Sequence, residues 1–121
     1  MNIKVGNDIV EVRRIKYLIE KYGDKFLNKV YTKNEIEYCN KSSDSKYQSL
    51  AARFAAKEAV FKSISDLYNN KLEWKKIEIL NEKSGRPKVN LFELSDKVSQ
   101  IDISLSHEKD YAIASVIIIL E

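Results

Sequence analysis

Apolar residues alternate with polar ones at both ends of the chain and follow a helical period in much of the stretch between them. The alternation predicts strands, because successive strand residues point to opposite faces. The predicted strands cover residues 3–12, with an interruption near Gly6-Asn7, and residues 74–80, 89–91, 101–105 and 111–120, the last being the most buried. Residues 84–87 form a turn in this interpretation, and residues 106–110 form a hairpin loop.

The helical period predicts one long helix and several short ones before it. The short helices cover residues 13–21, residues 24–30 after a break at Gly23-Asp24, and a third segment that runs to about Cys39. Thr32 followed by Glu35 is a capping box that opens this third helix. Residues 40–46 form a loop and residues 46–67 the long helix, and the pattern permits a further short helix over residues 92–98.

Helices early and strands late predict an α+β fold with a mostly antiparallel sheet. The length of 121 residues suits a single domain, residues 1–121. A hydrophobic content of 44% with 32% charged residues is that of a soluble globular protein. The single cysteine, Cys39, excludes an internal disulfide and is interpreted as a reduced bystander, which fits the cytoplasm. We find no signal-peptide pattern and no membrane span.

The net charge of +3 is too small to imply nucleic acid, but the charge is unevenly distributed. Residues 1–62 contain 13 Lys and Arg against 8 Asp and Glu, whereas the remainder contains 8 against 10. This asymmetry favours an acidic partner that approaches the N-terminal half, or else a basic surface that is simply solvated.

The long helix places a carboxylate in or beside its apolar stripe. Phe54, Glu58 and Phe61 stand at i, i+4 and i+7, and Lys62 follows Glu58 by one turn. A buried charge is costly unless it is paired or binds a metal. Because Arg53 and Lys57 add two cations nearby, the cluster could hold one divalent metal with the phosphates that it bridges. The alternative is one ordinary salt bridge between neighbouring turns.

Three further polar points have alternative interpretations. Asp8 follows Gly6 and is either a second carboxylate for Mg²⁺, which prefers oxygen ligands, or a side chain that binds backbone amides in a turn. His107, the only histidine, could bind phosphate or move a proton, or could be structural. In the turn Gly85-Arg86-Pro87, Arg86 could reach a phosphate, or the three residues could only reverse the chain.

Four motifs in order make the chain recognisable as a whole. They are GNDIV at residues 6–10, RFAAKEA at 53–59 with FK at 61–62, GRP at 85–87, and SLSHE at 104–108 with YA at 111–112. Together they resemble holo-[acyl-carrier-protein] synthase, the small bacterial family of 4′-phosphopantetheinyl transferases. The resemblance spans nearly the whole chain.

The resemblance implies transfer of 4′-phosphopantetheine from coenzyme A to a serine of apo-acyl carrier protein, with release of adenosine 3′,5′-bisphosphate, in support of fatty acid biosynthesis. By the family pattern, Asp8 and Glu58 hold Mg²⁺ against the pyrophosphate. Lys62 contacts that pyrophosphate and Arg53 the nucleotide end. His107 and the turn Gly85-Arg86-Pro87 line the coenzyme A site. Glu58 or a metal-bound water is the candidate base for the serine.

The resemblance also assigns partners. Acyl carrier proteins are acidic, and the family docks them on a basic, partly apolar N-terminal helix; the candidate docking residues are Arg14, Lys21, Phe26 and Lys29. Family members of this size resemble one another as homotrimers, with sites between protomers, and the resemblance implies the same assembly here. The alternative from another class is a non-catalytic basic module that binds an acidic protein or nucleic acid.

Overall fold

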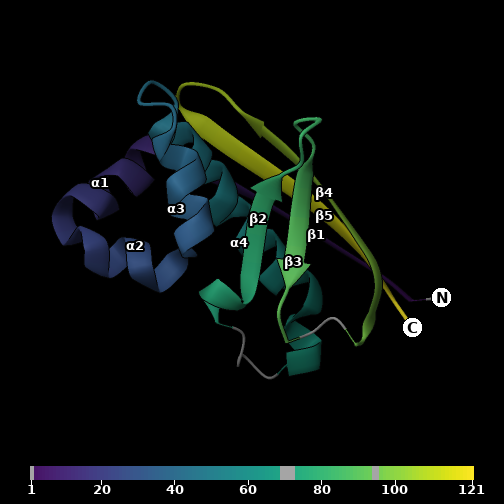
Figure 1. The fold of residues 1–121 in the computed structure, drawn as a ribbon. Coiled ribbons are helices and arrows are strands. Elements are labelled where there is room, and N and C mark those ends of the chain that lie inside the picture. Colours follow the sequence, from purple (N-terminus) through teal and green to yellow (C-terminus); the bar gives the residue numbers. More distant parts are fainter. Residues whose placement is uncertain (1, 69–72, 94–95) are drawn as a thin grey trace.

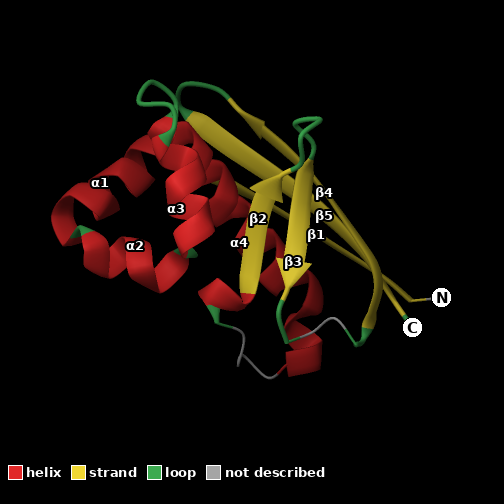
Figure 2. Cartoon of the chain, viewed as in Figure 1, coloured by secondary structure: helices red, strands yellow, loops and turns green. Residues whose placement is uncertain are grey.

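The computed structural model describes residues 2–68, 73–93 and 96–121. The chain opens with β1 (Asn2–Glu11), and four helices follow: α1 (Val12–Tyr22), α2 (Asp24–Val30), α3 (Lys33–Asn40) and α4 (Lys46–Tyr68). The remaining elements are a 3₁₀ turn, η1 (Trp74–Lys76), and the strands β2 (Ile77–Asn81), β3 (Pro87–Leu91), β4 (Val98–His107) and β5 (Tyr111–Leu120). Figure 2 shows α1, α2 and α3 together on one side, α4 behind β2 and β3, and two separate groups of strands, which confirms the α+β class.

β5 is the central strand of a three-stranded antiparallel sheet, with β1 on one side and β4 on the other. The pairing of β1 with β5 is continuous and begins with Asn2 opposite Leu120, so the two ends of the chain lie side by side (Figure 1). The predicted interruption near Gly6-Asn7 is therefore wrong. Gly6 lies inside the ladder, opposite Val116.

Gly6 is required by close packing and not by a bend in the strand. A Cβ atom at this position would lie 2.1 Å from the carbonyl oxygen of Ala59 on α4. The buried alanines of α4 allow this approach; they are Ala51, Ala52, Ala55, Ala56 and Ala59. Strand and helix therefore meet almost backbone to backbone.

α4 is the centre of the fold. It packs across β1 and β5 on one side and contacts α1, α3 and β2 on others. The helix begins at residue 46 as predicted and leaves helical geometry near its end, at Ile64 (φ −124°, ψ 17°). No helix among residues 2–68, 73–93 and 96–121 is long and apolar enough to cross a membrane.

The N-terminal helices follow the sequence signals. The break between α1 and α2 falls at Gly23, whose φ of +57° suits glycine. The capping box is confirmed, because the Thr32 hydroxyl accepts a hydrogen bond from the Glu35 amide while the Glu35 carboxylate accepts one from the Thr32 amide. Cys39 is buried on α3, and burial raises the pKa of its thiol, which agrees with a bystander.

The C-terminal half departs from prediction in three places. Residues 74–76 form the 3₁₀ turn η1, so strand β2 starts later than expected. In the stretch 92–98, the described residues 92–93 and 96–97 form turns instead of a helix, and residues 94–95 lie outside the described residues. β4 continues through His107, which shortens the predicted hairpin loop to residues 108–110. The turn at residues 84–87 is confirmed, with Gly85 at φ +91°.

The predicted burial of β5 holds for only one of its faces. Its even-numbered residues face α4 and are buried, whereas Ile113 and Ile117 are 44% and 51% exposed. Ile3, Val5 and Ile9 of the neighbouring β1 are also exposed on the outer side of the sheet. The described chain therefore carries a row of uncovered aliphatic side chains across two adjacent strands.

Candidate active site

Asp8 and Glu58 come from the two elements that meet at Gly6. Asp8 lies in regular β1, opposite Ala114, so the predicted strand irregularity and the alternative turn are both wrong. Its Oδ1 atom lies 2.7 Å from Nζ of Lys62 on α4. Lys62 therefore pairs with Asp8 across the strand–helix contact, and the simple salt bridge from Lys62 to Glu58 is not the one formed.

Three neighbouring charged groups, Asp8, Lys62 and Arg14, act on the carboxylate of Glu58. Burial raises the pKa of Glu58, and the negative charge of Asp8 raises it further, while Lys62 and Arg14 oppose the shift. The hydrogen bond to Asp8 is the main cause that raises the pKa of the Lys62 ammonium. Two carboxylates that repel each other beside one lysine form a site whose charge an added cation would balance.

The donor set at this cluster fits Mg²⁺ only if other oxygens complete it. Both side chains supply carboxylate oxygens, the ligand type that Mg²⁺ prefers while keeping several waters. Among the described residues, no group of three or more His, Cys, Asp or Glu gathers in a metal-binding arrangement. Waters and phosphate oxygens of a substrate are therefore the remaining donors.

A second part of the candidate site is a cavity of about 180 Å³ next to the β2–β3 turn. Arg53, Gly85, Pro87 and His107 line it, so four of the predicted coenzyme A residues lie together. Arg86 is not among its lining residues. It pairs with Asp102 at 2.6 Å and lines a neighbouring cavity of about 340 Å³.

Arg53 serves mainly as an internal support. Its side chain is buried, and its guanidinium group donates hydrogen bonds to the carbonyl oxygen of Ile79 at 3.0 Å, to Ser49 Oγ at 2.7 Å and to Asn81 Oδ1 at 2.6 Å. The Asn81 amide in turn donates to the Gly85 carbonyl oxygen at 2.8 Å. Arg53 thus holds the turn in place instead of presenting a free cation.

His107 stands at the exposed end of β4. Its Nδ1 lies 3.0 Å from Oε1 of Gln48 at the start of α4. The ring lines the cavity beside Arg53 and also a second one of about 310 Å³, whose other lining residues include Lys41 and Ser45. The imidazole therefore borders both cavities, with one of its ring nitrogens held by Gln48.

The candidate carrier-docking residues lie along α1 and α2. Arg14 is exposed and close enough to Glu58 to affect its pKa, which links α1 to the carboxylates. Lys21 and Lys29 are exposed, and the Lys21 ammonium lies over the ring of Tyr22 at 5.4 Å. Phe26 is only partly exposed and stacks on Phe54.

The partner of Lys57 is not indicated by the spacing of residues along the long helix. Lys57 was grouped with the phosphate-binding cations, but it is fully buried and pairs with Glu35. Burial lowers the pKa of Lys57, and the Glu35 carboxylate opposes that shift. A signal was present, because the buried Leu50 and Ile64 stand seven residues before and after Lys57 and mark an inward-facing row.

The comparisons with known proteins agree with this architecture. A sequence profile described as the 4′-phosphopantetheinyl transferase superfamily matches residues 4–116. The holo-[acyl-carrier-protein] synthase of Ruminiclostridium cellulolyticum is 46% identical over an alignment 126 positions long, which covers 99% of this chain and 94% of that protein. The chain belongs to the holo-[acyl-carrier-protein] synthase family. It is therefore a phosphopantetheinyl transferase, which favours the enzyme over the non-catalytic binding module.

Solved structures of the family share the fold of this transferase. The Bacillus anthracis synthase in complex with CoA (3′,5′-ADP) is 31% identical, with a TM-score of 0.78 over 95% of this chain and 94% of that one. The Helicobacter pylori synthase in complex with coenzyme A is 28% identical, with a TM-score of 0.83 over 94% of this chain and 98% of that one. The matched segment 4–116 contains every candidate site residue of this transferase.

Proposed function

We propose that the chain transfers 4′-phosphopantetheine from coenzyme A to a serine hydroxyl of an apo-acyl carrier protein, using Mg²⁺ and supporting fatty acid biosynthesis. The observation that carries the proposal is the convergence of Asp8, Glu58 and Lys62 where β1 meets α4, in a chain of this family. The relatives solved with coenzyme A support the donor. The whole chain acts as one transferase domain, in the reducing cytoplasm that its free Cys39 suits.

The serine oxygen attacks the β-phosphate of coenzyme A, and the bond to the bridging oxygen breaks to release adenosine 3′,5′-bisphosphate. Asp8 and Glu58 would hold Mg²⁺, which when bound supplies positive charge at the pyrophosphate oxygens. Lys62 exchanges its contact with Asp8 for a pyrophosphate oxygen and balances part of the charge that develops there. Glu58, whose pKa is raised, accepts the serine proton.

The cavity beside the β2–β3 turn receives the nucleotide end of coenzyme A in this proposal. His107 contacts it directly from the end of β4, and Gly85 and Pro87 also line the cavity. Arg53 contributes through Asn81, which it holds against the turn, and Arg86 approaches from the neighbouring cavity. The two parts of the site are thus carried by different faces of α4.

The decisive test is mass spectrometry of an apo-acyl carrier protein incubated with the chain, coenzyme A and Mg²⁺. We expect a gain of about 340 Da, the mass of one phosphopantetheine arm attached by phosphoryl-group transfer. An EDTA-treated sample should show no gain. A folded preparation that modifies none of several carriers would refute the proposed function, and full modification in EDTA would refute its dependence on metal.

Arg14 is proposed to dock the acidic carrier together with Lys21, Phe26 and Lys29. We expect Arg14→Glu to raise the KM for the carrier by roughly tenfold and the KM for coenzyme A much less, because a reversed charge at a docking surface opposes an acidic partner. Arg13→Glu is the matched control, since Arg13 is a neighbouring exposed arginine that already pairs with Glu11 at 2.8 Å. Equal effects of Arg14→Glu on both KM values would exclude Arg14 as a docking residue.

Copies of this chain are proposed to cover the aliphatic outer face of the sheet and to form a homotrimer. Exposed aliphatic rows of this kind mark interaction surfaces. We expect Val5→Glu to shift the protein toward monomer in sedimentation equilibrium, because Val5 is 64% exposed and stands opposite Ile117 in the register. Tyr22→Glu, on the exposed side of α1, should leave the mass unchanged. A wild-type chain that sediments as a monomer would refute the proposal.

A further inference from the structure

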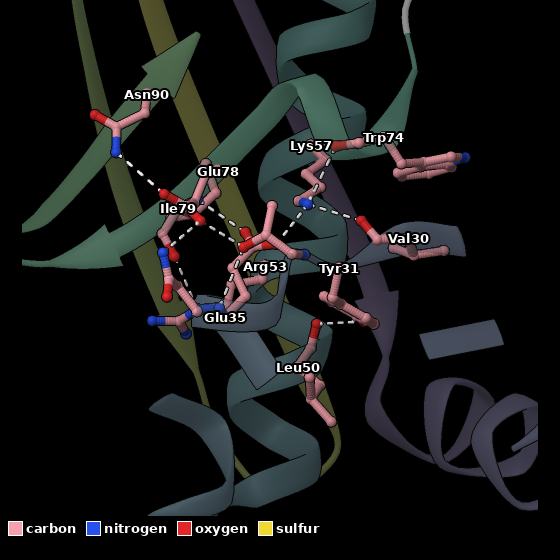
Figure 3. A network of polar contacts seen from close by, with 12 residues as sticks. Val30, Tyr31, Glu35, Leu50, Arg53, Lys57, Trp74, Glu78, Ile79 and Asn90 are labelled. Carbon is pink, nitrogen blue, oxygen red and sulfur yellow. Dashed lines mark hydrogen bonds and ion pairs between the residues drawn. The ribbon is translucent and has the colours of Figure 1, made fainter. Parts of the chain in front are cut away.

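The most deeply buried charges of the described chain lie beside the candidate site but outside it. The side chains of Lys57 and Glu35 have no exposed surface, and Lys57 Nζ lies 2.6 Å from Glu35 Oε1 (Figure 3). The Lys57 ammonium also donates to the carbonyl oxygens of Val30 at 2.7 Å and Trp74 at 3.2 Å. Three acceptors thus match the three donors of an ammonium group.

The Glu35 carboxylate connects three further elements. Its Oε1 atom accepts hydrogen bonds from Lys57 and from the Thr32 amide at 2.8 Å, and its Oε2 atom accepts one from the Ile79 amide at 2.8 Å. One carboxylate therefore joins the start of α3, the middle of α4 and strand β2. Figure 3 shows Glu35, Lys57 and Ile79 within one network of polar contacts between neighbouring elements.

One arm of this network reaches the residues around Glu58. The Trp74 ring stacks on Phe54 and meets Phe61 edge to face, each at 5.0 Å between ring centroids. Phe54 and Phe61 flank Glu58 on α4, four residues before it and three after it. Lys57 thus holds, through a backbone carbonyl oxygen, the residue whose ring packs on Phe54 and Phe61.

The other arm reaches the nucleotide side of the site. Ile79 receives Glu35 on its amide, and its carbonyl oxygen accepts the hydrogen bond from Nε of Arg53. Arg53 then holds Asn81, which holds the turn at Gly85. The buried pair is therefore connected to the turn at Gly85 on one side and to the aromatic residues that flank Glu58 along α4 on the other.

Stabilisation of the fold alone does not explain why a buried ion pair occupies this position. Desolvation of two charges offsets most of their attraction, so apolar residues of similar size often serve stability equally well. The best-attested use of a buried polar pair is to specify one arrangement of the surrounding elements. Here the arrangement includes the rotation of α4, which decides where Glu58 points.

We propose that Lys57, through its pair with Glu35, is a positioning residue of the transfer reaction. The pair fixes the rotation of α4 about its axis and the position of the Trp74 backbone. It thereby sets the direction in which Glu58 points toward Asp8. The inference rests on the proposed function, because only that function makes the position of Glu58 important for activity. The fixing of α4 and Trp74 by the pair of Lys57 and Glu35 is a property of the folded chain without substrates.

The test compares Lys57→Met and the uncharged double variant Lys57→Met/Glu35→Gln with wild type. Lys4→Met is the matched control, because it removes a lysine from an ion pair whose Asp66 partner is exposed. Two readouts are taken: kcat with the KM for coenzyme A, and acrylamide quenching of Trp74, the only tryptophan in the chain. Quenching requires no substrate, so it tests whether the pair of Lys57 and Glu35 holds Trp74 even if the wild-type chain proves inactive. An inactive wild-type chain would count against the proposed function and not against this inference.

We expect the double variant to fold, to lose kcat by roughly 10- to 100-fold, the range for residues that orient the ligands of a metal site, and to change the KM for coenzyme A far less. Quenching of Trp74 should increase, and Lys4→Met should match wild type in both readouts. Should Lys57→Met fail to fold because it leaves the buried Glu35 carboxylate unpaired, the double variant, which removes both charges, provides the same two measurements. A folded variant with wild-type kcat or wild-type quenching would overturn the inference, as would an equal loss in Lys4→Met.

Discussion

Glu58→Gln is expected to lower kcat by roughly 10²- to 10³-fold, the loss typical when one group that stabilises developing charge is removed, while raising the Tm of the metal-free protein. The two effects have one cause. Glu58 is partly buried and faces the negative charge of Asp8, so its charged form is unfavourable in the folded chain. Glutamine keeps the shape of the side chain and removes that charge, together with the proposed metal ligand and the proposed base.

The pH dependence of this stabilisation follows from the raised pKa of Glu58. The folded chain binds the Glu58 proton more tightly than the unfolded chain does, so the Glu58 contribution to stability is present at acid pH. It is lost as the pH rises through the folded pKa. The Tm advantage of Glu58→Gln should therefore be largest at neutral pH and disappear below the usual range of a glutamate.

Thermal unfolding at neutral and acid pH, with and without Mg²⁺, measures both effects. Glu20→Gln is the matched control, because it removes the same charge from the exposed surface of α1. Added Mg²⁺ should raise the Tm of wild type and leave that of Glu58→Gln nearly unchanged. A folded Glu58→Gln variant that retains wild-type kcat would exclude the assigned role, and a lowered Tm would contradict the electrostatic account.

Gly6→Ala is expected to have the largest effect on stability. The added methyl group would lie 2.1 Å from the Ala59 carbonyl oxygen, a backbone atom that can move only if α4 moves with it. Overpacking of this kind costs typically 1–3 kcal/mol and on occasion more, so we expect a loss of about 3 kcal/mol in the free energy of unfolding. Because the same displacement separates Asp8 from Glu58, activity should fall even where the variant remains folded.

Urea unfolding of Gly6→Ala beside Gly23→Ala separates crowding from backbone conformation. A Cβ atom at Gly23 meets nothing within 4 Å, so that variant has only the strain of its φ of +57°, about 1 kcal/mol. We expect the midpoint of Gly6→Ala to be the lower of the two. A Gly6→Ala variant as stable as Gly23→Ala would show that strand and helix are not in close contact.

Local signals in the sequence were sufficient for most of the elements. The capping box at Thr32, the break at Gly23 and the turn at Gly85 each depend on a few neighbouring residues, and all three are confirmed. The prediction at Gly6 is wrong for the same reason. Its local pattern indicates a bend in the strand, whereas a glycine is required there because Ala59, far away in the sequence, packs against it. Long-range packing leaves little trace in a local pattern.

The candidate site was predictable as a set of residues but not as a set of contacts. The family motifs brought Asp8, Glu58 and Lys62 together, yet the pairing of Lys62 with Asp8 depends on how β1 lies on α4. Lys57 was misassigned because its charge suggested solvent or phosphate, whereas its partner Glu35 had already been explained as a helix cap. One side chain with two simultaneous purposes is difficult to recognise from spacing alone.

The pairing of β1 with β5 has a consequence for the order of assembly during protein synthesis. β1 is made first, but the strand that it pairs with spans residues 111–120. A nascent chain that ends before Tyr111 lacks the central strand of the sheet, so the strand that carries Asp8 has no neighbour to pair with. Contacts of such long sequence separation form late, so the two carboxylates of the candidate site, Asp8 and Glu58, come together only after the ribosome has made β5.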